Sequence, residues 1–273
     1  MSMSANLTIA RPADAFDRVA ATYDDIFTRS AIGAVQRCQV WRRLLHAFPL
    51  GERILELNCG TGEDARFLAS RGRSVVACDA SRQMIEVASA RAQQEGASIE
   101  ITFHHLATED LADLPEQAPF DGAFSNFSGL NCVADLHLVA GDLASLVRPG
   151  GNVLLCLWNR ICPVEIFWHL IHARVQKAFR RFSRSSTARI GERTILIFYP
   201  TVHDVQRAFA PWFVLKRHTA VGLFVPPTYF ERWAVSHRAT LNHLDQLDAA
   251  FTEWPIFRNL GDHVVLEFAR CTL

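Results

Sequence analysis

The sequence is most informative over Ile54-Leu55-Glu56-Leu57-Asn58-Cys59-Gly60-Thr61-Gly62-Glu63-Asp64-Ala65. A short apolar run ends at an acid, a loop with two glycines follows, and a helical pattern begins at residue 63. Asp79 ends a second apolar run over residues 74–78. Glycine lets the backbone approach a ligand closely, and a carboxylate after the second strand can accept two hydroxyl hydrogen bonds from a ribose. The pattern predicts a unit that holds a nucleoside.

Two kinds of nucleoside cofactor suit this layout. In a dinucleotide-binding fold, the glycines approach a pyrophosphate at a helix N-terminus, and Gly60-x-Gly62-x-x-Ala65 fits that spacing loosely. Glu56, just before the loop, would repel a pyrophosphate but favour a ligand with a positive sulfonium and a free ammonium. Glu63 and Asp64 add negative charge at the start of the next helix. The charges favour the second kind of ligand, and a nicotinamide-dependent oxidoreductase remains the alternative.

These residues resemble the first motif of the class I S-adenosylmethionine-dependent methyltransferases, which usually reads hydrophobic-acid-x-Gly-x-Gly-x-Gly. Asn58 stands in the first glycine position, and asparagine tolerates the left-handed backbone conformation that such a position requires. The resemblance covers about half the chain and continues in the family's order through three further stretches: Asp79-Ala80-Ser81 with Met84, Phe120-Asp121-Gly122-Ala123-Phe124-Ser125-Asn126, and Leu146-Val147-Arg148-Pro149-Gly150-Gly151-Asn152-Val153-Leu154.

The resemblance implies S-adenosyl-L-methionine as the cofactor and gives each motif a part in binding it. Glu56 is expected to hold the methionine amine region, and Asp79 to accept hydrogen bonds from the ribose hydroxyls. The other expected contacts are Asn58, Cys59 and Gly60 along the methionine moiety, Ala80 and Met84 on adenine, Ala107 and Thr108 at its edge, and Asn126 and Phe127 on the methyl side.

The segment near Ala107 departs from the family, which commonly has an acid after the third strand. Adenine would then be read by backbone groups around Ala107 and Thr108, or by Glu109 after a shift of register. Thr108 also suits the N-cap of a short helix. Both interpretations can hold together.

The N-terminal segment Phe16-Asp17-Arg18-Val19-Ala20-Ala21-Thr22-Tyr23-Asp24 is similar to the entry segment of quinone-biosynthesis-type methyltransferases. That resemblance implies that the segment folds over the cofactor and that Tyr23 lies near its methionine end. The alternative is a packing tyrosine on an amphipathic helix. Arg37, Arg42 and Arg43 could reach the cofactor carboxylate or could simply be solvated.

The composition predicts one large α/β domain with insertions, since the chain has 273 residues and 49% of them are hydrophobic. Lys+Arg and Asp+Glu balance at 28 each, so the charge does not indicate a nucleic-acid partner. The cysteines form no CxxC pair and are typical of reduced thiols in a cytoplasmic protein. No signal peptide, transmembrane helix or stable membrane association is predicted.

Strand-like and helical patterns alternate from residue 53 to residue 157, which predicts a parallel sheet with helices on both faces. Strands are expected at 53–57, 74–78, 99–103, 120–125 and 152–157, and helices at 63–71, 81–94, 109–113 and 135–147. Two late strands at 212–218 and 263–268 complete a Rossmann-like seven-stranded sheet, and the resemblance implies that they pair and that the last strand is antiparallel. The expected organisation of 1–273 is N-terminal cap helices (1–50), a cofactor-binding core (51–158), an insertion (159–200) and the C-terminal part of the sheet (201–273).

The insertion between the fifth and sixth strands is predicted to hold an amphipathic, basic helix. Its apolar stripe comprises Trp168, Ile171, Val175, Ala178, Phe179 and Phe182, and its basic residues are Arg174, Lys177, Arg180, Arg181 and Arg184. It could act as a lid over the acceptor, contact an anionic substrate or touch a membrane surface. The alternative is a helix docked on the sheet with a solvated basic face.

The expected reaction is methyl transfer by in-line displacement to a small acceptor. The acceptor is expected to be hydrophobic because the covering segments are rich in Phe, Trp and Pro. A base is needed only for a weakly acidic hydroxyl, a protonated amine or a carbon acid. His169, or Tyr23 acting through water, are the candidates for it, and no metal site is predicted. The rivals are the oxidoreductase and a methyltransferase-like protein that binds without turnover.

Overall fold

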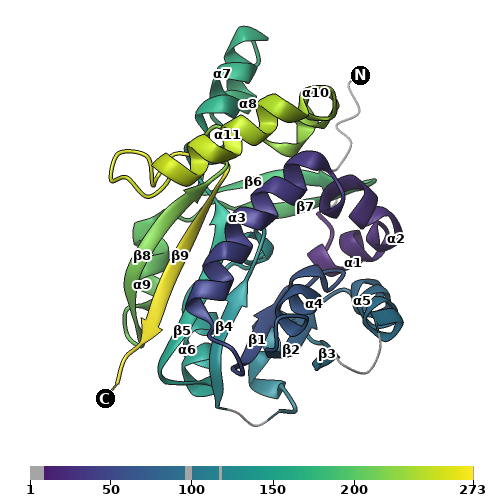
Figure 1. Ribbon diagram of the computed structural model, residues 1–273, viewed down its shortest axis with the longest axis vertical. Helices are drawn as coiled ribbons and strands as arrows, with labels where there is room; N and C mark the ends of the chain where they lie inside the picture. Colours follow the sequence, from purple (N-terminus) through teal and green to yellow (C-terminus); the bar gives the residue numbers. More distant parts are fainter. Residues whose placement is uncertain (1–8, 96–99, 117–118, 273) are drawn as a thin grey trace, which may run out of the picture.

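The computed structural model describes residues 9–95, 100–116 and 119–272. Within these residues a central seven-stranded sheet has the order β3-β2-β1-β4-β5-β9-β8 (Figure 1). The strands are β1 (Arg53–Leu57), β2 (Ser74–Asp79), β3 (Ile101–His105), β4 (Phe120–Ser125), β5 (Val147–Trp158), β8 (Phe213–Val221) and β9 (His263–Arg270). Strands β1 to β5 are parallel, whereas β9 runs antiparallel to both β5 and β8. The predicted Rossmann-like sheet and the pairing of the late strands are confirmed.

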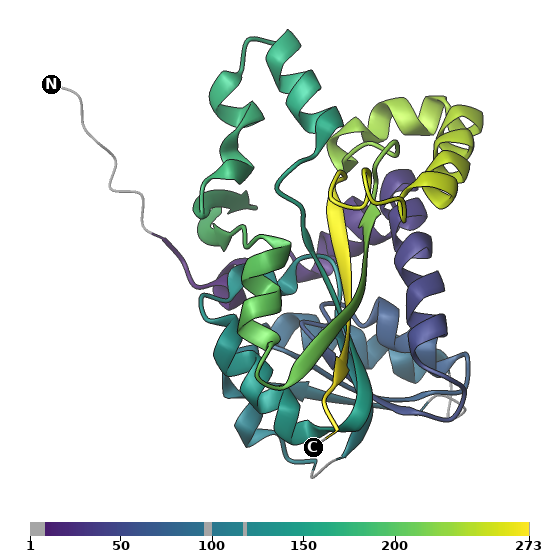
Figure 2. The ribbon, with the colours of Figure 1, turned by 90° about the vertical axis from the view of Figure 1, so that its left-hand side faces the viewer.

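Helices cover both faces of this sheet. Helices α3 (Ala31–Ala47), α4 (Glu63–Ala69) and α5 (Arg82–Glu95) lie on one face, and α6 (Leu136–Leu146) and α9 (Val202–Phe209) lie on the other (Figures 1 and 2). Alternate residues of β1 serve the two faces, since Ile54 packs with α3 and α4 while Leu55 and Leu57 pack with α6. Burial on both faces is why these strands are almost continuously apolar in sequence.

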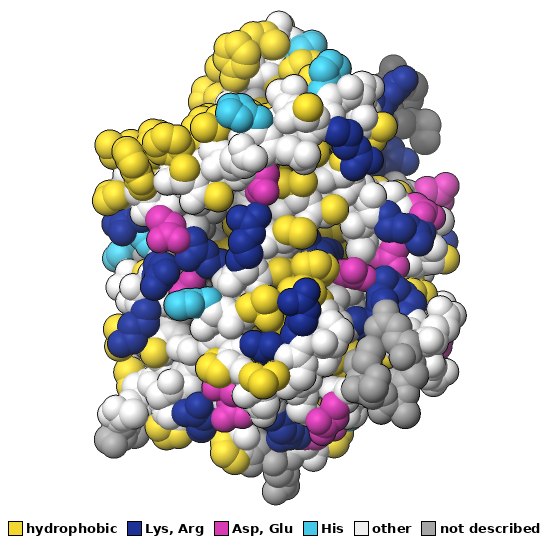
Figure 3. Space-filling model, in the orientation of Figure 1, with side chains coloured by type: hydrophobic (Ala, Val, Ile, Leu, Met, Phe, Trp, Pro, Cys, Tyr) yellow, Lys and Arg dark blue, Asp and Glu magenta, His cyan; other side chains and the backbone are white. Residues whose placement is uncertain are grey.

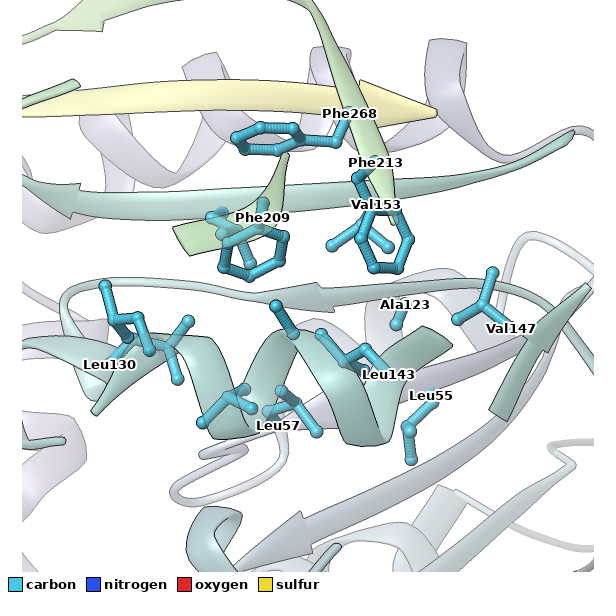
Figure 4. Packing of buried hydrophobic residues seen from close by; sticks show 14 of the residues in the cluster. Leu55, Leu57, Ala123, Leu130, Leu143, Val147, Val153, Phe209, Phe213 and Phe268 are labelled. Carbon is cyan, nitrogen blue, oxygen red and sulfur yellow. The ribbon is translucent and has the colours of Figure 1, made fainter. Parts of the chain in front are cut away.

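The core on the α6 side continues under the late strands. Phe209 of α9 stacks on Phe268 of β9 with ring centroids 4.9 Å apart and also contacts Phe213 of β8 at 5.6 Å (Figure 4). All three side chains are almost fully buried. This packing attaches the C-terminal part of the chain to the same core as the parallel strands.

The N-terminal segment forms short helices, as expected. They are α1 (Pro12–Asp17), α2 (Ala20–Tyr23) and a π-helical turn over Asp24–Thr28 before α3. Asp17 accepts hydrogen bonds from the Ser81 hydroxyl at 2.6 Å and from the backbone N–H of Gln83 at 3.0 Å. This contact ties α1 to the start of α5, at the carboxyl end of β2.

The insertion differs from the single amphipathic helix predicted for it. The chain forms α7 (Pro163–Ile171), α8 (Val175–Ala178), a 3₁₀ turn (Arg180–Phe182) and a separate hairpin of β6 (Ser185–Ile190) and β7 (Arg193–Phe198). The predicted helix is wrong because Ala173 adopts a left-handed conformation, with φ 54°, between α7 and α8. The alternative of a helix docked on the sheet with a solvated basic face is also wrong, since most of the apolar stripe is exposed while Arg181 is buried.

The C-terminal helices α10 (Glu231–Ser236) and α11 (Arg238–Phe251) pack against α3 after a 3₁₀ turn at Thr228–Phe230. Two further 3₁₀ turns, Thr108–Asp113 and Gly129–Cys132, follow β3 and β4. Among the described residues, every helix is too short or too polar to span a bilayer.

Candidate functional site

A cavity lies at the carboxyl ends of β1, β2 and β4, under the N-terminal helices. Most of the predicted cofactor residues line it: Tyr23, Asn58, Cys59, Gly60, Asp79, Ala80, Met84, Asn126 and Phe127. The N-terminal segment contributes Pro12, Ala13 and Phe16, which the sequence analysis did not assign. The edge of a parallel sheet where strands end is the usual place for a ligand in such folds.

The loop after β1 has the geometry of a close backbone approach. Asn58, Gly60 and Gly62 all adopt left-handed conformations, with φ values of 55°, 54° and 73°. A Cβ at Gly62 would lie only 2.9 Å from the Cβ of Ala88, so α4 and α5 can pack here only because residue 62 is glycine. The left-handed conformation expected of Asn58 is confirmed.

The side chain of Asn58 is occupied within the protein. Its Nδ2 donates to Oγ1 of Thr108 at 2.8 Å, and its Oδ1 accepts from the Ser125 hydroxyl at 3.1 Å. Asn58, which stands where the family motif has a glycine, therefore links the loop to β4 and to the 3₁₀ turn after β3. Because the amide is satisfied by these partners, the loop presents mainly backbone groups to the cavity.

Asp79 is the best-oriented carboxylate of the cavity. Its Oδ2 accepts from the backbone N–H of Gly60 at 2.9 Å, and its Oδ1 accepts from the backbone N–H of Ser81 at 2.8 Å. Burial raises its pKa, and the two backbone hydrogen bonds oppose that shift. Each oxygen keeps a lone pair, so the group can accept from two neighbouring hydroxyls.

Glu56 does not line the cavity but lies behind its loop. It is 1% exposed, and its Oε2 has no hydrogen-bond partner in the described structure. Burial and then the nearby Asp64 raise the pKa of Glu56 well above its usual range. The cavity itself is lined by the acids Glu63, Asp64 and Asp79, which make this end of the sheet a poorer place for a diphosphate than for a cation.

Arg37 is the cation of the site. Its Nη1 lies 2.6 Å from Oδ2 of Asp64, and its guanidinium lies 4.8 Å from the ring centroid of Phe127. Asp64 also accepts from Nε1 of Trp41 at 2.6 Å and from Nδ2 of Asn126 at 2.9 Å. This buried cluster holds Arg37 rigidly at the cavity wall.

Of the three arginines that the sequence offered as partners for the cofactor carboxylate, the structure places one at the cavity and two away from it. Arg37 lines the cavity, whereas Arg42 pairs with Asp245 and Arg43 pairs with Glu253, both on the side of α3 that faces α11. A signal was present in the sequence, because Arg37 is followed by Val40 and Leu44 at helical spacing. Those apolar residues mark the inward face of α3 and place Arg37 on it.

Aromatic side chains form the part of the cavity wall beside Arg37. Tyr23 contacts Phe16 and Phe27, with centroids 6.3 and 5.8 Å apart, and Phe27 contacts Phe127 at 4.9 Å. Burial raises the pKa of Tyr23 to about 12. At neutral pH the phenol is therefore protonated, which suits a hydrogen-bond donor better than a general base.

Ala107, Thr108 and His169 lie outside the lining of the cavity. The expectation that Thr108 caps a helix is wrong, because Ala107 holds the cap position and the Thr108 hydroxyl instead accepts from Asn58. His169 is buried on α7, with its ring 6.1 Å from that of Tyr229 and its Nδ1 without a partner in the described structure. Burial lowers its pKa.

A second group of ligating side chains, Cys162, Glu165 and Asp262, has its donor atoms within 4.8 Å of one another. The guanidinium of Arg181 already donates to both carboxylates. Burial also raises the pKa of Cys162 to about 12, so its sulfur is a thiol. A cation here would have to displace Arg181 and a proton, so the donor set does not suit a metal ion.

Comparison with known proteins gives a family for the core. Residues 54–151 match a model described as a methyltransferase domain. The chain is 32% identical over 148 residues to the tRNA 5-carboxymethoxyuridine methyltransferase of Escherichia coli K12, covering 53% of this chain and 56% of that protein. It is 34% identical over 142 residues to the demethylmenaquinone methyltransferase of Clavibacter sepedonicus, covering 52% and 55%. The matches thus span about half the length of these relatives.

Solved structures share the fold over most of the chain. An S-adenosylmethionine-dependent methyltransferase from Mesorhizobium loti aligns with a TM-score of 0.54 and 19% identity, covering 86% of this chain and 98% of that one. The geranyl diphosphate C-methyltransferase of Streptomyces coelicolor aligns with a TM-score of 0.55 and 13% identity, covering 86% and 79%. These structures show the shared fold, and the methyltransferase-domain match, with the sheet order, the glycine loop and the carboxylate after β2, places residues 54–151 in the class I S-adenosylmethionine-dependent methyltransferases.

Proposed function

We propose that this protein transfers a methyl group from S-adenosyl-L-methionine to a small, hydrophobic acceptor. The observation that carries the proposal is the Asp79 carboxylate, held by the backbone N–H groups of Gly60 and Ser81 at the edge of the cavity. That geometry suits a ribose diol. The acids that line the cavity, Glu63 and Asp64, suit a sulfonium and disfavour the diphosphate of the oxidoreductase alternative.

The lining residues divide naturally among the parts of the cofactor. Asp79 would accept from the ribose, and Ala80 and Met84 would pack on adenine. Arg37 would bind the methionine carboxylate, because its guanidinium faces the cavity and its Nε has no partner in the described structure. The remaining roles are proposed for Asn58, Cys59 and Gly60 along the methionine backbone, Glu56 behind its ammonium, Ala107 and Thr108 beyond the adenine edge, and Tyr23, Asn126 and Phe127 on the methyl side.

The protein's task in this reaction is mainly positioning. The sulfonium of the cofactor supplies an already activated methyl group, whose bond to sulfur breaks as the acceptor's lone pair bonds to carbon. Tyr23 and Phe127 would form a dry wall beside that carbon, since Phe27 packs behind both rings. Exclusion of water and alignment of the acceptor together lower the barrier.

The proposal of a small acceptor rests on the aromatic wall and the balanced charge of the chain. The relatives differ in this respect, since one is named for demethylmenaquinone and another for a tRNA nucleoside. A tRNA substrate would call for a cavity open to a flipped base and a basic rim around it. The cavity here is lined by Glu63, Asp64 and Asp79 with one cation, Arg37, which is already paired with Asp64.

The test is calorimetric titration of the protein with S-adenosylhomocysteine, with NADH titrated in parallel. Micromolar binding of S-adenosylhomocysteine alone is expected, followed by acceptor-dependent formation of S-adenosylhomocysteine from the methyl donor. Binding of NADH alone would favour the oxidoreductase. Binding without turnover of any acceptor, hydrophobic small molecules and tRNA included, would favour the non-catalytic alternative.

A further inference from the structure

The insertion has a charged interior and an apolar exterior. On α7, Glu165 and His169 are buried, at 1% and 8% exposed, one helical turn apart. The intervening and following apolar side chains point outward, with Phe167, Leu170 and Ile171 exposed by 67%, 42% and 57%. This is the reverse of an ordinary surface helix, which turns its apolar stripe toward the core.

The 3₁₀ turn that contains Arg181 also buries a charged side chain and exposes apolar ones. Its side chain is buried and donates to Oδ1 and to the backbone carbonyl of Asp262, each at 2.7 Å, and to Glu165. Its neighbours Phe179 and Phe182 are about half exposed. The buried ion pairs join α7, the 3₁₀ turn and the start of β9. The apolar residues are therefore displayed on an anchored element.

The resulting surface, here called the insertion face, combines apolar and basic side chains. Figure 3 shows apolar side chains gathered at the upper tip of the molecule, where Figure 1 places α7. The exposed apolar members are Phe167, Leu170, Ile171, Val175, Phe179 and Phe182. The exposed basic residues between α7 and β6 are Arg174, Lys177, Arg180 and Arg184, and the one acid of residues 163–184, Glu165, is buried. The chain as a whole has no net charge, so this basic excess is local.

We propose that the insertion face docks reversibly on the surface of an anionic lipid bilayer. Its apolar side chains would enter the boundary between headgroups and acyl chains, and its arginines and lysine would contact the headgroup phosphates. A bilayer would bind both the apolar and the basic side chains of the insertion face. Nucleic acid would use the basic residues and the phenylalanines, but Leu170, Ile171 and Val175 gain nothing from phosphate contacts or base stacking.

The insertion face adjoins the cavity through a short chain of contacts. Asp262, which holds Arg181, precedes His263, and the ring of His263 meets that of Phe127 edge-on with centroids 5.4 Å apart. Phe127 lines the cavity. If the proposed function holds, a lipid-dissolved acceptor would reach the cavity from the docked side. The docking itself does not depend on catalysis.

The experiment is sedimentation of the whole protein with vesicles of phosphatidylcholine alone and of phosphatidylcholine mixed with phosphatidylglycerol. Binding to the mixed vesicles is expected, weakening as salt is raised. The double variant Phe167→Ser/Ile171→Ser and the double variant Arg174→Gln/Lys177→Gln should each lose about tenfold or more in vesicle affinity. The matched control is Leu138→Ser, since Leu138 is 64% exposed and belongs to α6, which lies well away from α7 (Figure 1).

Three results would overturn the proposal: equal binding to both kinds of vesicle, loss of binding in the control as in the face variants, or no vesicle binding at all. A single-stranded RNA probe tests the nearest rival. RNA affinity that falls in Arg174→Gln/Lys177→Gln but not in Phe167→Ser/Ile171→Ser, without vesicle binding, would assign the face to nucleic acid. Titration with S-adenosylhomocysteine should be unchanged in every variant, which separates failure of the docking proposal from failure of the proposed function.

Discussion

The sheet core and the insertion bury opposite kinds of residue. Strand β1 buries Ile54, Leu55 and Leu57 between two layers of helices. The insertion buries Glu165 and Arg181 and exposes Phe167 to solvent. An apolar stripe therefore identifies the inward face of a helix or strand only where another element packs against that stripe. In the insertion, specific ion pairs determine which side faces inward.

Truncation of one phenylalanine in each region gives the largest expected contrast. Phe268→Ala should lower the free energy of unfolding by about 4 kcal/mol, because it opens a cavity among Phe209, Phe213 and Val153. Phe167→Ala should change it by less than about 0.5 kcal/mol, because the side chain is mostly solvated. Denaturant titration of both variants measures the difference. A large loss in Phe167→Ala would mean that the side chain is covered in solution, for example by a second copy, and dilution would then lower stability.

Removal of the buried Arg181 cation should have the next largest effect on stability. Arg181→Met leaves the carboxylates of Glu165 and Asp262 buried without their partner, at a cost of about 3 kcal/mol. Local opening of α7 relieves that cost more cheaply than global unfolding does. Hydrogen exchange should therefore accelerate in α7 and the 3₁₀ turn while β1 and β4 stay protected.

The matched control is Arg180→Met. Arg180 also pairs with Glu165, but its side chain is 41% exposed. Its loss should cost no more than about 1 kcal/mol and leave exchange in α7 nearly unchanged. Equal effects of the two substitutions would contradict the view that burial gives Arg181 its importance.

Asp79 tests the cofactor site within the core. Asp79→Ala should weaken binding of S-adenosylhomocysteine by about 2 kcal/mol, roughly 30-fold, because it removes charge-assisted hydrogen bonds to the ribose and releases the N–H of Gly60. Asp79→Asn keeps an acceptor and should lose less. Calorimetry at constant pH provides the measurement, and unchanged affinity in both variants would mean that the ribose lies elsewhere.

The two regions also differ in how far the sequence predicts them. The strands over residues 53–57 and 120–125 were predicted with the bounds observed, because they are buried on both faces and end at glycine- or asparagine-containing turns. Lining residues on those strand ends followed from the same motifs. The predictions that failed depended on contacts distant in sequence: Arg181 meets Asp262 only in the folded chain, and Thr108, after β3, meets Asn58, after β1, past the intervening β2. No local pattern encodes such pairs.

The smallest expected effect concerns Asn58, where the loop departs from the family's glycine. Asn58→Gly removes the hydrogen bonds to Thr108 and Ser125, which costs about 2 kcal/mol, but relieves the left-handed strain by about 1 kcal/mol. The net loss of stability should be about 1 kcal/mol. S-adenosylhomocysteine affinity should change by less than about threefold, because the side chain points to protein partners and the backbone path is kept.

Asn58→Ala separates the two contributions. It loses the same hydrogen bonds without relief of strain, so it should be about 1 kcal/mol less stable than Asn58→Gly in denaturant titration. If Asn58→Gly instead lost tenfold or more in affinity while keeping its stability, the asparagine side chain would contact the cofactor directly. The loop would then bind the cofactor through side chains as well as backbone. Asn58 would belong with the residues that bind the cofactor and not with the polar residues that only stabilise the core.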